Sequence, residues 1–171
     1  MRYVILGFCV FAAACAGEGS GAPTSPSSST GGAALTDATH GSELPFKGTL
    51  QATETQDPAN FDLKHLIGTG NATYLGRFTL TATFLVSDVN GVPTAAGDAT
   101  WTAANGDQIF ADVAGKAVVD FPHAALTETH TITGGTGRFA GASGTIFIER
   151  SLNLVTGVSS ASLSGAMSLG R

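Results

Sequence analysis

Apolar and polar residues alternate with a period of two along most of the chain from Leu44 onward. In the clearest run, one face would carry Phe78, Leu80, Ala82, Phe84 and Val86, and the other Arg77, Thr79, Thr81 and Thr83. Near the C-terminus the same alternation places Ala161, Leu163, Gly165, Met167 and Leu169 opposite Ser160, Ser162, Ser164 and Ser168. This pattern predicts strands with one buried and one solvent-facing side, which is typical of antiparallel sheets.

Turn-forming dipeptides separate these runs. Asn90-Gly91 and Asn105-Gly106 suit tight hairpins, because both central positions of a type I′ turn need a positive φ. We predict eight strands, at 45–54, 62–71, 74–88, 97–104, 107–119, 126–134, 143–153 and 159–169. Eight antiparallel strands with short links indicate an all-β fold, an eight-stranded antiparallel β-barrel that leaves no free edge. A β-sandwich is the alternative, and the pattern alone does not separate the two.

The first 42 residues follow a different pattern. Residues 1–14 comprise a positive start at Arg2, a short apolar run and a small-residue cleavage site, which is the order of a secretory signal peptide. The apolar run is shorter than the roughly 20 residues that a membrane-spanning helix needs. Residues 15–42 are rich in Gly, Ser, Thr and Pro, and we expect a disordered tether. A single folded domain is then expected over 43–171.

The segment Ala12-Ala13-Ala14-Cys15 resembles the lipobox of bacterial lipoproteins. The resemblance implies that Cys15 is the lipid attachment site and that the exported protein contacts a membrane through this lipid. Ala16 follows the cysteine, which favours the outer membrane or cell surface. The alternative is ordinary cleavage at an Ala-x-Ala site, which would give a secreted or periplasmic protein.

Composition excludes several classes of function. The formal net charge is −5, and the eight Lys and Arg residues are scattered singly, so no basic stripe is available for nucleic acid. Both cysteines lie in the first fifteen residues, so the folded part has no disulfide, thiolate metal site or cysteine nucleophile. The four histidines lack the close spacing of metal ligands. We therefore expect neither a metal nor another cofactor.

The glycine-rich stretch 131–144, which includes Gly134-Gly135-Thr136-Gly137-Arg138-Phe139, resembles the signature of the allene oxide cyclase and dirigent barrels. Residues 65–78 together with 104–107 resemble bacterial exported proteins with the same barrel-like domain. The resemblance covers roughly residues 44–169 and implies a barrel that binds hydrophobic small molecules in its mouth. Some family members cyclise or couple such molecules without a cofactor. Related barrels are often trimeric, so a homo-oligomer is an open alternative.

The glycines of this stretch have a structural interpretation. They permit tight reversal and close backbone approach, and Phe139 would plug one end of the barrel. A phosphate cradle would need a following helix and usually a lysine, and the sequence shows neither.

Glu128 and His130 are the candidate catalytic residues. They share one face of a predicted strand with Ile132, whereas the threonines at 127, 129, 131 and 133 share the other. If the Glu128 face points inward, a carboxylate and an imidazole line the cavity and could perform acid–base chemistry. The alternative is that this face meets solvent and the threonines pack inside. Glu149 and Arg150 are adjacent and must face opposite sides.

Tyr74, Trp101 and Phe110 are candidate pocket aromatics, with core packing as the alternative. Asp112 would share a strand face with Phe110 and is a candidate pocket residue as well. 

We expect a non-enzymatic module, anchored in the envelope by a lipid, that binds an apolar small molecule or a partner. The alternative is a cofactor-independent cyclase or isomerase of the allene oxide cyclase type. An enzyme requires an enclosed cavity with at least two inward polar groups. A structural barrel should instead be filled by side chains such as Phe78, Phe84, Ile146 and Met167.

Overall fold

The computed structural model describes residues 43–170. The predicted signal peptide, Cys15 and the predicted tether lie outside these residues. The described part contains eight strands and one short 3-10 helix, η1 (Gly137–Phe139). The strands are β1 (Leu44–Gln56), β2 (Leu63–Ala72), β3 (Gly76–Val89), β4 (Val92–Ala103), β5 (Gln108–Asp120), β6 (His123–Gly135), β7 (Ser143–Asn153) and β8 (Val158–Ser168).

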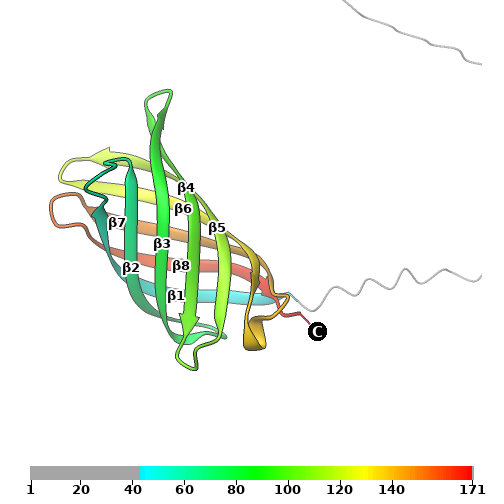
Figure 1. Cartoon of the computed structure of the whole chain (residues 1–171). Helices are drawn as coiled ribbons and strands as arrows, with labels where there is room; N and C mark the ends of the chain where they lie inside the picture. Colours follow the sequence, from blue (N-terminus) through cyan, green and yellow to red (C-terminus); the bar gives the residue numbers. More distant parts are fainter. Residues whose placement is uncertain (1–42, 171) are drawn as a thin grey trace, which may run out of the picture. The chain divides into compact units, whose positions relative to one another are not determined.

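The strands form a closed antiparallel barrel (Figure 1). Each strand pairs with the next one along the chain, and β8 returns to pair with β1 from Leu44↔Met167 to Thr53↔Val158. The predicted eight-stranded antiparallel β-barrel is thus confirmed, and the sandwich alternative is wrong. Closure pairs the outer strands that a sandwich would leave as edges.

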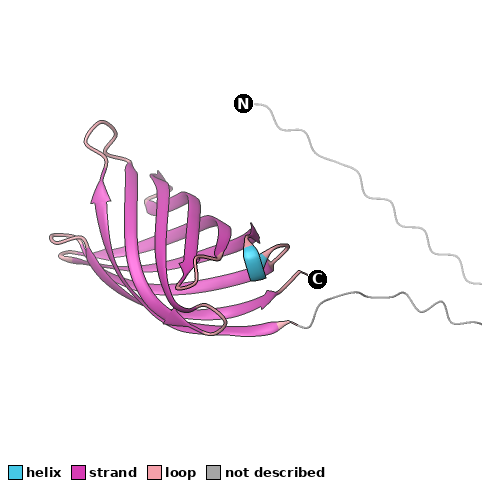
Figure 2. Cartoon of the chain, turned by 60° about the horizontal axis from the view of Figure 1, so that its bottom comes forward, coloured by secondary structure: helices cyan, strands magenta, loops and turns pink. Residues whose placement is uncertain are grey.

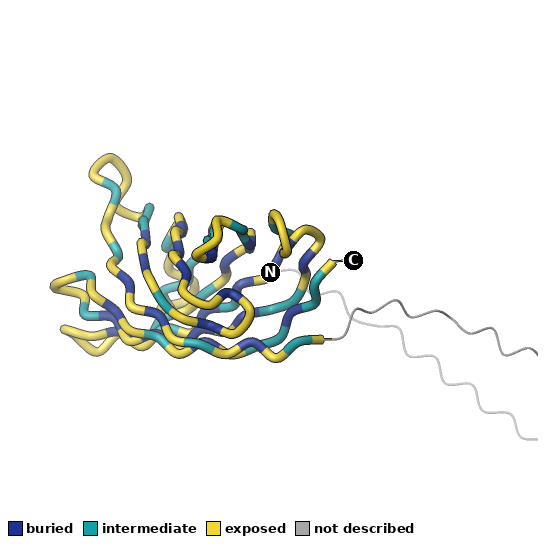
Figure 3. Tube along the Cα trace, turned by 90° about the horizontal axis from the view of Figure 1, so that it is seen from below, coloured by how far each residue is buried: buried dark blue, intermediate teal, exposed yellow. Residues whose placement is uncertain are grey.

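Buried and exposed residues alternate along the strands, as the period-two pattern predicts (Figure 3). The inward positions form one continuous apolar core. Phe78, Phe84, Ile146 and Met167, which we expected inside a filled barrel, are all buried. Side chains therefore occupy much of the interior, as the narrow width of an eight-stranded barrel requires.

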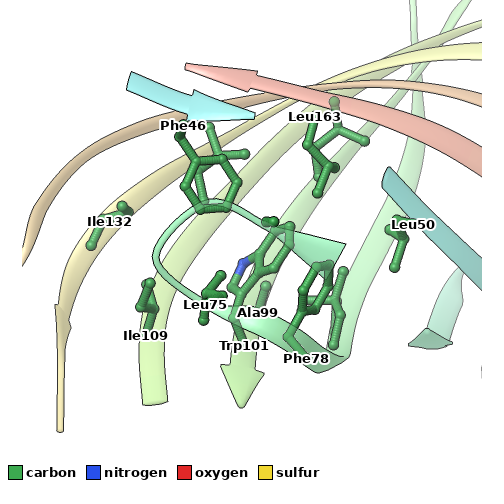
Figure 4. Close-up of a cluster of buried hydrophobic side chains, with 14 of the residues drawn as sticks. Phe46, Leu50, Leu75, Phe78, Ala99, Trp101, Ile109, Ile132 and Leu163 are labelled. Atoms are coloured by element: carbon green, nitrogen blue, oxygen red, sulfur yellow. The ribbon is translucent and has the colours of Figure 1, made fainter. Parts of the chain in front are cut away.

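Large side chains close one end of the barrel. Trp101 is fully buried there, with its ring 6.2 Å from Phe46 and 5.0 Å from Phe78 between centroids (Figure 4). The η1 turn lies beside the end of β8 (Figure 2) and carries the fully buried Phe139. The Arg138 guanidinium covers the ring of Phe139 at 4.8 Å.

The glycine-rich connection between β6 and β7 depends on backbone conformations that favour glycine. Gly137 begins η1 with a φ of +55°, and a Cβ there would overlap the carboxylate of Asp107. At Gly135 a Cβ would overlap the Gln108 carbonyl oxygen. The stretch is therefore a tight turn that seats Phe139 at the closed end.

The opposite end of the barrel is bordered by four connections, at 57–62, 90–91, 121–122 and 154–157. We call this end the mouth. The β3–β4 hairpin is the connection that projects farthest from the barrel in Figure 1.

Candidate functional site

Strand β6 places Glu128 and His130 inside the barrel. Their side chains are 9 % and 2 % exposed, whereas Thr127 and Thr131 on the opposite face are exposed. The alternative in which the threonine face packs inside is therefore wrong. The inward face of β6 is set by its apolar members, Ala124 and Ile132, which are both buried in the core. 

Arg150 of β7 supplies a positive charge next to the Glu128 carboxylate on this inward face. Its Nε and Nη2 donate to Oε1 of Glu128 at 2.8 and 2.6 Å, and its Nη1 donates to Oε2 of Glu54 at 2.9 Å. Ser159, also buried, donates to the Ala52 carbonyl at 3.3 Å and lies 3.5 Å from Nη1. We refer to Glu54, Glu128, His130 and Arg150 as the interior cluster. Burial of the charges of Glu54, Glu128 and Arg150 is tolerable because these three side chains are paired and hydrogen-bonded to one another.

Glu128 is held in its charged form. Burial, the largest influence, raises its pKa, but contact with His130 and the positive charge of Arg150 together lower it more. The net result is a pKa below the ordinary value of 4.5. The separation of 3.6 Å between His130 Nε2 and Glu128 Oε2 is longer than a hydrogen bond, so we treat this contact as electrostatic.

Deeper in the barrel, three buried nitrogens lack a hydrogen-bond partner among the described residues. They are Nε1 of Trp101 and both ring nitrogens of His130. The two rings meet edge to face, with centroids 5.5 Å apart and planes at 74°. Each of these nitrogens could take part in a hydrogen bond that the described residues do not supply. Leaving a buried polar group unsatisfied costs about 1–3 kcal/mol of stability.

A cavity of about 150 Å³ lies between the mouth and the interior cluster. Glu54 and Glu128 line its inner end, and Lys64 lines it nearer the mouth, where its Nζ donates to the Phe61 carbonyl at 2.7 Å. The rest of the lining is mainly apolar and includes Phe84, Val86, Ala95, Ala117, Val119, Ala124, Leu126, Leu152 and Leu154. The cavity can therefore hold a small apolar group above a charged floor.

Exposed apolar side chains surround the mouth. The residues of this apolar rim are Phe61, Val89, Val92, Val118, Val119, Phe121, Leu154, Val155 and Val158. All four connections at this end, or the strand ends beside them, contribute to it. Exposed apolar residues gathered around one opening are a signal of an interaction site, unlike the same residues scattered singly.

A larger hollow of about 770 Å³ lies elsewhere, on the outer wall of β1 to β4. Exposed outward-facing residues such as Thr49, Gln51, Thr69 and Thr79 line it. It contains no buried charged side chain, so we place the candidate site in the barrel interior rather than in this hollow.

None of the four predicted pocket residues is among those that line the cavity. Tyr74 occupies the β2–β3 turn with a φ of +66°, and Phe110 and Asp112 point outward from β5. Phe110 and Asp112 point outward because the inward positions of β5 are the odd-numbered ones, such as Ile109. Only Trp101 lies inside, as part of the core.

Sequence reasoning missed Arg150, Glu54 and the apolar rim. It placed Arg150 opposite Glu149 without deciding which one faces inward. The signal was the run Ile146, Ile148, Arg150 and Leu152, in which an arginine continues an apolar face. The rim was visible as large apolar residues in turns such as Phe61 and Val155, where polar residues are usual.

Within residues 43–170, no three His, Cys, Asp or Glu side chains are grouped as metal ligands. No helix in this part of the chain is both long and apolar enough to cross a membrane.

No family model matches the chain, and no curated protein or solved structure is significantly similar to it. The likeness of residues 131–144 to allene oxide cyclase and dirigent barrels therefore stays a prediction. A barrel fold by itself does not determine chemistry, so the argument for function depends on the cavity and the interior cluster.

Proposed function

We propose that this chain is a binding module that takes an apolar small molecule into the mouth of its barrel. The observation that carries the proposal is the cavity of about 150 Å³, lined mainly by apolar side chains and opening within the apolar rim. A dry apolar cavity of about this volume accommodates a molecule the size of benzene. Drug-sized ligands need about 300–1,000 Å³, so only one end of a larger ligand would enter.

The proposal also places the protein at the cell envelope. The signal-like residues 1–14 and the lipobox-like sequence ending at Cys15 support a lipid anchor. Intact mass of the mature protein from its native cell tests this part: a diacylated chain beginning at Cys15 is the expected result. An unmodified N-terminus after cleavage would instead indicate a secreted or periplasmic protein.

The second candidate function is a cofactor-independent cyclase or isomerase. It is favoured by the inward placement of Glu128 and His130, 3.6 Å apart. A general base works best when its pKa lies near the working pH. The pKa of Glu128 is lowered instead, and Arg150 occupies its Oε1 with two hydrogen bonds. These contacts favour a structural and binding role for the carboxylate over a catalytic one.

Filling the cavity tests the binding proposal. Ala95 points into the cavity and its neighbour Ala96 points to solvent, so Ala95→Leu and Ala96→Leu form a matched pair. Benzene and hexan-1-ol are the probes, and isothermal titration calorimetry measures their binding. We expect saturable binding to the wild type and to Ala96→Leu, and a clear loss of affinity in Ala95→Leu. Absence of saturable binding to the wild type would refute the proposal.

A further inference from the structure

The floor of the cavity presents hydrogen-bond acceptors. Arg150 uses Nε, Nη1 and Nη2 on Oε1 of Glu128 and Oε2 of Glu54, and its side chain is only 1 % exposed. Each carboxylate therefore keeps one oxygen that Arg150 does not bind, Oε1 of Glu54 and Oε2 of Glu128. Both glutamates line the cavity, so an entering group meets carboxylate oxygens and not the guanidinium.

The floor also carries more negative than positive charge. Two carboxylates share one guanidinium, and the nearest other partner is His130, 3.6 Å from Glu128. Lys64 donates a hydrogen bond to the Phe61 carbonyl at the mouth and makes no ion pair within 4.0 Å with any residue of 43–170. Lys116 of β5 also lines the cavity, but its side chain is largely exposed, and no described carboxylate lies within that distance of it. Glu54, 13 % exposed, is thus the carboxylate whose charge is least compensated.

His130, which lies deeper than the floor and does not itself line the cavity, is a further buried polar group with unmet hydrogen-bonding capacity next to Glu128. Its side chain is 2 % exposed, and neither ring nitrogen has a hydrogen-bond partner among the described residues. Natural interiors rarely leave such groups unsatisfied unless water, an ion or a ligand completes them.

We propose that the inserted end of the ligand carries a primary amine, so that the ligand is a small apolar molecule with an ammonium group. This inference rests on the proposed function and names the chemistry of its ligand. An ammonium group donates to Oε1 of Glu54 and neutralises the second carboxylate of the floor. A hydroxyl group offers a donor without charge, and a carboxylate is repelled.

The opposite orientation places an anionic head beside Lys64 at the mouth. The apolar end of such a ligand would then cover the free oxygen of Glu54 without giving it a hydrogen bond. Desolvating a carboxylate oxygen that has no hydrogen bond is costly, so this orientation is disfavoured.

The test compares three probes with the same six-carbon body: hexylamine, hexan-1-ol and hexanoate. At neutral pH they present an ammonium, a neutral hydroxyl and a carboxylate. Affinities for the full chain are measured by isothermal titration calorimetry, with benzene as the reference for cavity binding. We expect hexylamine to bind at least about tenfold more tightly than hexanoate, since hydrogen bonds to charged groups contribute about 1.5–3 kcal/mol. In Glu54→Gln the ratio of the hexylamine affinity to the hexanoate affinity should fall to near one, while benzene binding persists.

Each outcome has a distinct meaning. Benzene binding with equal or tighter binding of hexanoate refutes the amine inference and leaves the proposed function in place. If the wild type prefers hexanoate and Lys64→Gln loses this preference, the carboxylate head of the ligand binds at the mouth, beside Lys64. Failure of every probe, benzene included, refutes the proposed function and the inference together. The wild-type series decides the question even if Glu54→Gln fails to fold.

Discussion

The guanidinium of Arg150 donates two hydrogen bonds to a single oxygen of Glu128, at 2.8 and 2.6 Å, inside the barrel. Both side chains are almost fully buried, and the third contact of the guanidinium joins β1 through Glu54. The contacts connect β6 and β7, which are paired neighbours, to β1, which is separated from β7 by β8 in the closed sheet. They also leave the second oxygen of each carboxylate without a hydrogen bond from Arg150.

Arg150→Met should destabilise the barrel by about 3–5 kcal/mol, because it leaves buried carboxylates without a counter-charge. Denaturation by urea, followed through Trp101 fluorescence, measures the loss. Glu149→Gln is the control, since Glu149 is the exposed neighbour of Arg150 and should change stability by less than about 0.5 kcal/mol. The triple variant Arg150→Met, Glu54→Gln, Glu128→Gln should recover part of the loss. Equal effects at 149 and 150 would contradict the role given to the pair.

Stability should fall on acidification through Glu128. Its pKa in the folded state lies below 4.5, so its contribution is complete above that pH and is lost as the pH falls through the folded-state pKa. Glu128→Gln should therefore be less stable than the wild type at about pH 7, with the difference shrinking towards about pH 3. Urea unfolding at several pH values measures both curves. Parallel curves would mean that protonation of Glu128 does not contribute to acid sensitivity.

Gly137→Ala should destabilise the turn that seats Phe139. The new Cβ meets the Asp107 carboxylate and must also adopt a φ of +55°, which costs about 1–3 kcal/mol for the backbone alone. Gly76→Ala is matched to it, because Gly76 has a similar φ of +64° with open space around its Cβ position. The difference in unfolding free energy between the two variants isolates the overlap with Asp107. No difference would show that the Asp107 side chain moves aside freely.

The apolar rim should contribute to the binding of ligands longer than the cavity. Lengthening hexan-1-ol to decan-1-ol should raise affinity in the wild type, since each buried methylene contributes about 0.8 kcal/mol. Val119→Ser with Val155→Ser should reduce this gain without lowering thermal stability. Ile67→Ser with Phe147→Ser is the control, because these residues are also exposed but lie on the outer wall. A similar reduction in both double variants would argue that the rim has no special role.

The strands could be predicted because their alternation is local. The largest difference between the predicted and the observed strand bounds is in β4, which begins at Val92 and not at residue 97. The two faces of the strand differ little in polarity at Thr94, Ala95, Ala96 and Gly97. No alternating pattern therefore marked the strand there. Pairing with β3, from Val89↔Val92 onward, extends β4 to the Asn90-Gly91 turn. Closure was predicted from the eight strands and their short links, but the register of the closing pair was not, because β1 and β8 lie at the two ends of the domain.

The site was less predictable than the fold, for a physical reason. Both faces of β6 contain polar residues, so alternation alone could not show which one lies inside. The deciding partner is Arg150, whose pairing with Glu128 depends on tertiary structure. Phe110 shows the converse: a large apolar residue predicted for a pocket lies outside because its odd-numbered neighbours fill the core.

Both ends of the barrel's own chain emerge at its closed end. β1 starts at Leu44, opposite Met167 near the end of β8, so every connection around the mouth is an internal loop. Immobilising the barrel through residue 43 or residue 170 would leave the mouth facing away from the support. The four loops could then be diversified as a randomised library on a fixed frame. The same architecture that closes the sheet makes the domain a candidate scaffold for engineered receptors.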